Sequence, residues 1–118
     1  MTEIHKAGKT TVAPDVLISI TRMSALSVPG VSRMANVTGG VNRLFKRRVH
    51  DGVRIEVKDN VVVADLYLIL KKDVNIRDTS RNTQQQVARA IQETVGMDIG
   101  RIEIHIEDID YETEAVTE

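Results

Sequence analysis

Two neighbouring segments with strand periodicity constrain the fold of this chain more than any other feature. Residues 53–57 alternate aliphatic with charged side chains, which is typical of a half-buried strand. Asp59-Asn60 follows with turn chemistry, and residues 61–70 form a second, more apolar strand segment. We therefore predict an antiparallel hairpin. Because side chains alternate between the two faces of a strand, the second strand presents one apolar set to a single face: Ala64, Leu66, Leu68 and Leu70.

Two segments with helical spacing flank this hairpin. In the first, apolar residues recur three and four positions apart between Pro14 and about Leu26, and a Pro-Gly pair ends the helix. The second helix is expected to run to about Val95, with Gly96 as its C-terminal cap. Three residues are candidate N-caps for this second helix: Asp78, Thr79 and Ser80.

Four shorter elements complete the prediction. We expect strands at residues 9–12, 31–37 and 102–106, and a short amphipathic helix at residues 41–47. After the last of these strands the apolar positions change phase, so we expect a bulge near residues 107–108.

Together these elements predict one α/β domain of the α+β type, in which two principal helices pack on one face of a small, mainly antiparallel sheet. The strands at residues 53–57, 61–70 and 102–106 are expected to place their aliphatic side chains in one buried layer. Aromatic residues make up only 3% of the chain, so Val, Ile and Leu must fill that layer, with Met as the gap filler.

The length of 118 residues fits a single domain with short ends. We expect the domain to span residues 9–112, between a flexible N-terminus (1–8) and an acidic C-terminal tail (113–118). The chain has no cysteine, which excludes disulfides and thiolate metal sites. No apolar run approaches the roughly 20 residues of a membrane-spanning helix, and the first residues do not resemble a signal peptide. We therefore expect a cytoplasmic protein.

The sequence contains none of the common catalytic motifs. The phosphate-binding loop, the dinucleotide-binding glycine pattern and the nucleophile elbow do not occur, and Gly39-Gly40 is interpreted as a turn. Asp65 stands out in an apolar strand. Either it pairs with a base or lies at the exposed sheet face, or it is a carboxylate tuned for chemistry. We expect a protein that is not an enzyme, with no cofactor and no small-molecule substrate.

Glu103, His105 and Glu107 project from one face of the last predicted strand. Residues of these types can bind a metal ion. Alternating charged residues are, however, more typical of the solvated face of a strand, and no second group of ligands supports a metal. We therefore expect no metal site.

A cluster of basic residues precedes and enters the hairpin: Arg43, Lys46, Arg47, Arg48 and Arg54. Three interpretations compete, namely a solvated face, a surface for an acidic partner or an anionic membrane, and a nucleic-acid footprint. The scarcity of aromatic residues and the small net charge make nucleic acid the weakest of the three. The sequence does not separate the first two.

The net charge of −1 hides an uneven distribution along the chain. Residues 1–60 carry ten Lys and Arg against five Asp and Glu, whereas residues 61–118 carry six against twelve. Either the fold mixes the two halves and cancels their charges, or the division supports head-to-tail self-association.

Three groups of residues occur in a specific order: Ala13-Pro14-Asp15-Val16-Leu17 with Val28-Pro29-Gly30-Val31; Gly52-Val53-Arg54-Ile55-Glu56-Val57 with Val63-Ala64-Asp65-Leu66-Tyr67-Leu68-Ile69-Leu70; and Val74-Asn75-Ile76, Val95-Gly96-Met97 and Ile102-Glu103-Ile104-His105-Ile106. In this order and spacing they resemble the alkaline-shock, or envelope stress response, protein family of bacteria. The chain departs from the family where the last helix usually opens with a proline and small apolar residues. Here that place is taken by four other residues: Arg77, Thr79, Ser80 and Thr83.

This resemblance implies a small cytoplasmic α/β protein without known catalysis that is linked to stress on the cell envelope. It also implies homo-oligomers, because self-association is common in the family. Some members lie at the membrane through a separate membrane-embedded partner, so peripheral membrane association through such a partner is a further expectation. The family pattern contains no catalytic residues that could be carried over to this chain.

Overall fold

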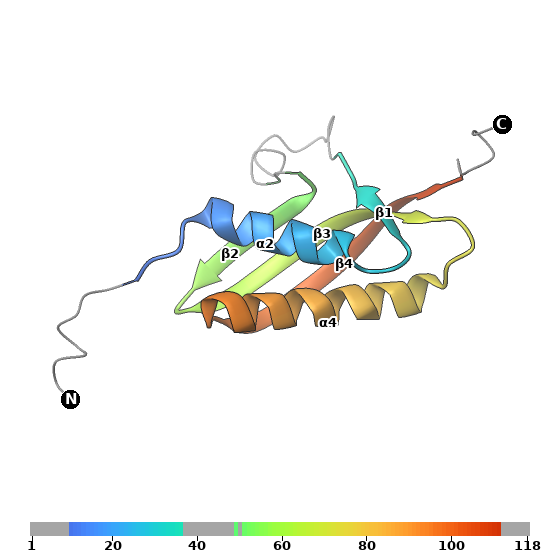
Figure 1. Ribbon diagram of the computed structural model, residues 1–118. Helices are drawn as coiled ribbons and strands as arrows, with labels where there is room; N and C mark the ends of the chain where they lie inside the picture. Colours follow the sequence, from blue (N-terminus) through green and yellow to red (C-terminus); the bar gives the residue numbers. More distant parts are fainter. Residues whose placement is uncertain (1–9, 37–48, 50, 112–118) are drawn as a thin grey trace, which may run out of the picture.

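The computed structural model describes residues 10–36, 49 and 51–111, drawn in colour in Figure 1. Along the chain these residues form α2 (Pro14–Leu26), β1 (Val31–Met34), β2 (Val53–Lys58), β3 (Val61–Lys71), α4 (Ile76–Val95) and β4 (Asp98–Asp110). Both helices lie on the same face of the four-stranded sheet (Figure 1). The chain therefore has the α+β architecture that the sequence predicts.

β3 is the central strand of the sheet. β2 pairs with the first part of β3, from Val61 to Leu66, and β1 pairs with the last part, from Leu68 to Leu70. Both pairings are antiparallel, whereas β4 runs parallel to β3 along its whole length. Because β4 occupies one edge of β3, β1 and β2 follow each other along the other edge. The predicted hairpin of β2 and β3 is confirmed, and two of the three pairings between described strands are antiparallel.

The ends of β1 and β2 meet beside Tyr67 of β3. The Tyr67 amide donates to the Gly52 carbonyl (N···O 2.8 Å), and the Tyr67 carbonyl accepts from the Ala35 amide (2.7 Å). Gly52 has a φ of +77°, and a Cβ at this position would lie only 2.9 Å from the Ala35 carbonyl oxygen. Glycine is required here because any side chain would displace backbone.

The core lies between the helices and the sheet. The residues of β3 that face the helices are all fully buried: Val62, Ala64, Leu66, Leu68 and Leu70. Leu17 of α2 and Val87 and Ile91 of α4 pack against them. The isoleucines of β4 continue this layer, since the register places them beside the same face of β3: Ile102, Ile104 and Ile106. The predicted buried layer is therefore confirmed for β3 and β4. For β2 it is confirmed only in part, because Val53 is buried but Val57, near the β2–β3 turn, is 46% exposed.

The N-cap of α4 is Asn75, whose side-chain oxygen accepts a hydrogen bond from the Asp78 amide (2.9 Å). The prediction of Asp78, Thr79 or Ser80 as the N-cap is wrong, because the asparagine already binds the free amide of the first turn and places all three inside the helix. At the other end, Gly96 has a φ of +73° and caps the helix as predicted.

β4 contains the bulge that the change of phase predicts. Ile106 pairs with Leu68 and Asp108 pairs with Ile69, which leaves Glu107 as the extra residue. The bulge restores Ile109 to the side of the sheet that faces the core.

The other three short predicted elements have different outcomes. Residues 10–12 are not a strand, and that prediction is wrong, because these residues lie against Leu17, Ile55 and Met97 instead of pairing with an edge strand. The strand predicted at residues 31–37 is present as β1. The helix predicted at residues 41–47 lies outside the described residues.

Candidate functional site

The sheet face away from the helices carries a buried carboxylate. Alternation along β3 turns Asp65 to this face, with only 5% of the residue exposed. The register places Arg54 of β2 directly beside Asp65 on one side and Glu103 of β4 directly beside it on the other. His105 lies two residues further along β4, beside Tyr67. Residues from three strands therefore meet around one carboxyl group.

Both carboxylate oxygens of Asp65 have partners. The Arg54 guanidinium donates to Oδ2, and it also pairs with Glu56. The Nε2 atom of His105 lies 3.0 Å from Oδ1. The imidazole in turn stacks on the ring of Tyr67, with 4.5 Å between ring centroids and 13° between planes. We call these five residues the Asp65 network.

The Asp65 network holds its central group in the charged form. Burial raises the pKa of the Asp65 carboxyl, but the hydrogen bonds from His105 and Arg54 and the charge of Arg54 outweigh burial and keep this pKa below its ordinary value of 3.8. Burial also raises the pKa of the Tyr67 hydroxyl, and the charge of Asp65 adds to that rise. The structure thus favours one of the two readings of Asp65, a carboxylate paired with a base.

Two members of the network, Asp65 and His105, form a group of three potential metal ligands with Glu103. One ligand atom each from Asp65, Glu103 and His105 lies within 4.8 Å of the other two. The sequence pattern suggested Glu103 and His105 with Glu107 as the third residue. Glu107 is the bulge residue of β4, and Asp65 takes its place in this group. Asp65 could not be found from spacing, because only the pairing of β3 with β4 brings it beside Glu103 and beside His105, which is 40 positions further along the chain.

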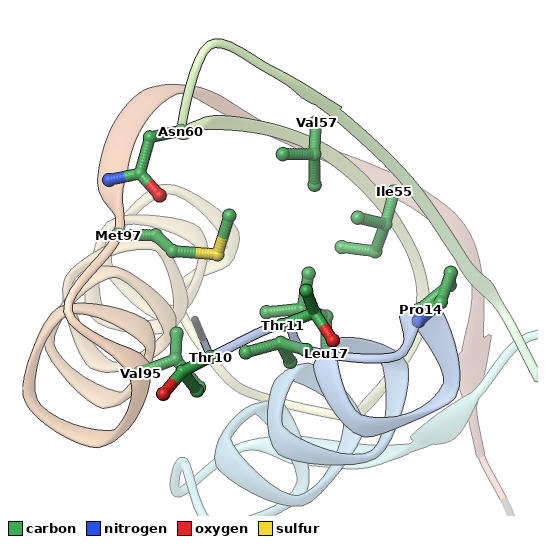
Figure 2. Close-up of a pocket in the computed structure, with 10 residues that line it drawn as sticks. Thr10, Thr11, Pro14, Leu17, Ile55, Val57, Asn60, Val95 and Met97 are labelled. Atoms are coloured by element: carbon green, nitrogen blue, oxygen red, sulfur yellow. The ribbon is translucent and has the colours of Figure 1, made fainter. Parts of the chain in front are cut away.

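A separate pocket opens on the other side of the sheet, between the start of α2, the β2–β3 turn and the end of α4 (Figure 2). Its volume is about 520 Å³. The lining is mixed: the aliphatic side chains of Leu17 and Ile55 and the Met97 sulfur face the space together with the polar side chains of Thr10, Thr11 and Asn60 (Figure 2). Such a lining offers apolar contacts and a few hydroxyl and amide groups, and none of the residues that line it is an acid, a base or a histidine.

The predicted basic cluster is only partly visible. Four of its members lie outside the described residues: Arg43, Lys46, Arg47 and Arg48. The fifth, Arg54, has a side chain that is 15% exposed and engaged by Asp65 and Glu56. The charge of Arg54 is therefore balanced inside the sheet face, and its role in binding an anionic partner stays a prediction.

Neither of the described helices, α2 and α4, combines the length and the apolar character that crossing a bilayer would require.

Solved structures with a similar fold include the MamM CTD. Its copper form has a TM-score of 0.59 with 14% identity, over 85% of this chain and 90% of the MamM CTD. A zinc form of a MamM CTD variant has a TM-score of 0.57 with 13% identity, over 82% of this chain and 87% of that one. At these identities the likeness is one of fold alone.

Similarity in sequence is more informative. The Bacillus subtilis protein YqhY is 29% identical to this chain over 110 residues, which are 92% of this chain and 82% of YqhY. Residues 2–111 match the alkaline shock protein 23 family, which is described by a cell envelope-related function. The chain therefore belongs to the alkaline shock protein 23 family.

Proposed function

We propose that this protein is a non-enzymatic interaction protein of the cell envelope, which associates with itself and reaches the membrane through a separate membrane-embedded partner. Its family supports the envelope role. The chemistry of the Asp65 network supports the absence of catalysis, because its charged groups neutralise one another and the pKa of Asp65 is too low for a proton donor at neutral pH.

Exposed apolar side chains on the outer side of α2 support the proposal of self-association. Val16 and Met23 lie on one side of this helix, seven positions apart, and they are 45% and 66% exposed. Ile20 lies between them and is half-buried. Covering apolar side chains of this size with a partner lowers the free energy, because it removes apolar surface from water. A second copy of the chain is the partner that requires no other component.

Sedimentation or light scattering across a range of protein concentrations tests this proposal. We expect a mass above that of one chain at the higher concentrations. Replacing Val16 and Met23 by glutamine, which keeps helix propensity, should shift the association to higher concentration. Ile76→Gln is the matched control, because Ile76 is 48% exposed but lies at the start of α4. A single-chain mass at every concentration would refute self-association.

Membrane recruitment through a partner calls for a different measurement. The purified protein should sediment with membranes that retain their proteins, and it should not float with vesicles made from the extracted lipids alone. Digesting the membrane proteins beforehand should abolish the sedimentation. If the protein bound the pure lipid vesicles equally well, direct recognition of an anionic surface would replace the partner in this proposal.

A further inference from the structure

We propose that Asp65, Glu103 and His105 bind a divalent transition-metal ion, with Zn²⁺ the best match, on the sheet face away from the helices. Each residue offers one ligand atom, and these atoms lie within 4.8 Å of one another. Carboxylate oxygen and imidazole nitrogen are common ligands of Zn²⁺, and three protein ligands leave one position for water or for a group of a partner. The site is independent of self-association through α2.

The sheet fixes the positions of all three ligands. Asp65 and Glu103 are direct neighbours across the β3–β4 pairing, and His105 is two residues from Glu103 on the same strand. Residues two apart on a strand share a face, so all three side chains leave the sheet on the same side. The metal would therefore bind to a preformed arrangement, with little backbone to order.

The distance between the two best-placed ligand atoms suits a shared ion. Nε2 of His105 and Oδ1 of Asp65 are 3.0 Å apart. Two ligand atoms at about 2.0–2.1 Å from a tetrahedral zinc ion lie roughly 3.3 Å from each other. A shift of a few tenths of an ångström would thus convert the hydrogen bond into joint ligation through Nε2, with the N–H proton of the neutral imidazole carried on Nδ1.

Neighbouring residues hold these ligands in place. Arg54 binds Oδ2 of Asp65, which leaves Oδ1 turned toward His105, and the Tyr67 ring fixes the plane of the imidazole. Such supporting contacts are typical around metal ligands. The positive charge of Arg54 opposes a cation, but Glu56 pairs with that guanidinium and offsets part of its charge.

Glu103 is the adjustable third ligand. Its side chain is 49% exposed and forms a 3.1 Å ion pair with the exposed Arg101. Exposed pairs of this kind contribute little free energy. A metal ion can therefore take the Glu103 carboxylate from Arg101 at small cost.

Titration of Zn²⁺ into the chelator-treated full-length protein, followed by calorimetry, tests the site. We expect one ion bound per chain. His105→Asn and Glu103→Gln should each weaken zinc binding by about tenfold or more. Both side chains are partly exposed, so both variants are expected to fold, which their circular dichroism spectra would verify.

Two matched controls separate this site from adventitious binding. Glu107→Gln removes an exposed carboxylate of the same strand, and His50→Asn removes another imidazole of the chain. Neither should change the zinc affinity. The proposal is overturned if Zn²⁺ does not bind at one equivalent, or if His105→Asn and His50→Asn bind it equally. The masses measured for the α2 variants do not bear on either outcome.

Discussion

Asp65 illustrates how partners on adjacent strands decide the role of a single residue. Its carboxylate is nearly inaccessible, yet it remains charged because Arg54 and His105 each engage one oxygen. The sequence predicts that this aspartate is unusual, since it interrupts an apolar strand. It does not identify the partners, because Arg54 and His105 are distant in sequence and reach Asp65 only through strand register.

We expect Asp65→Asn to lower the free energy of unfolding by about 3 kcal/mol at neutral pH, because it removes the buried partner of the Arg54 guanidinium and leaves that charge to the exposed Glu56. The folded-state pKa of Asp65 is below the unfolded value of 3.8. Its stabilising contribution is therefore complete above about pH 4 and is lost as the pH falls through the folded-state pKa.

Urea unfolding at a series of pH values measures this effect. The difference in stability between the wild type and Asp65→Asn should shrink as the solution is acidified below about pH 4. Glu93→Gln, at an exposed position of α4, serves as the control and should keep the wild-type pH dependence. A difference that stayed constant down to the lowest pH would contradict the assignment of the charge to Asp65.

Two buried threonines of the core differ in whether their hydroxyl has a hydrogen-bond partner, so we expect different effects on stability when each is replaced by valine. The hydroxyl of Thr21 is buried and has no hydrogen-bond partner among the residues that the structure describes. The equally buried hydroxyl of Thr83 donates to the Thr79 carbonyl (2.8 Å). Thr21→Val should therefore stabilise the fold by about 1 kcal/mol, whereas Thr83→Val should gain less or lose stability. Thermal unfolding of the two variants side by side measures this, and equal midpoints would show that the Thr21 hydroxyl is satisfied in solution.

At the level of elements, local chemistry predicts much of this fold. Residues 53–57 and 61–70 carry their periodicity and their turn, so the hairpin follows from neighbouring residues. The sequence places the start of α4 too late, because several residues that could cap a helix occur in succession. Only the structure shows that the Asn75 side chain accepts the capping hydrogen bond. The end-to-end meeting of β1 and β2 depends on a third strand, so no local pattern could reveal it.

Substitution of Gly52 tests how tightly the ends of β1 and β2 pack beside Tyr67. Its φ is +77°, and a Cβ would lie 2.9 Å from the Ala35 carbonyl oxygen and 3.0 Å from that of Tyr67. We expect Gly52→Ala to destabilise the protein by about 2 kcal/mol or more, through backbone strain and the contact together. Gly96 is the matched control, because its φ is +73° but nothing lies within 4 Å of a Cβ there. Gly96→Ala should cost about 1 kcal/mol. Equal losses in denaturant unfolding would mean that Ala35 can move aside.

At the level of the whole molecule, the described parts of the two halves of the sequence pack against each other, because β1 and β2 pair with β3 and α2 packs against α4. β1 and β2 of the first half lie along one edge of β3, and β4 of the second half lies along the other. The described part of the first half, however, carries four Lys and Arg against four Asp and Glu. Its positive excess therefore belongs to residues outside the described part. If attraction between opposite charges promotes self-association, most of the positive charge involved lies in the basic cluster.

The charge of the basic cluster can be reversed without changing the Asp65 network. Arg54 is left unchanged, and the other four basic residues of the cluster are replaced by glutamate: Arg43, Lys46, Arg47 and Arg48. We expect self-association to weaken by about tenfold or more. We also expect the wild type to dissociate as salt is raised from about 0.1 M to about 1 M, where the Debye length falls from about 10 Å to about 3 Å, and the variant to lose this sensitivity. Light scattering at both salt concentrations measures this.

The same change in net charge can be made elsewhere, at four exposed positions of the second half: Lys71, Lys72, Arg77 and Arg81. These replacements should affect self-association much less, because they add negative charge to a half that is already acidic and leave the basic cluster intact. If both variants weakened association equally, overall repulsion would explain the result and the cluster would have no specific role. If the first variant instead lost binding to anionic vesicles or to nucleic acid while its self-association stayed intact, the cluster would serve an anionic ligand, and the contact between copies would rest on the apolar side of α2 alone.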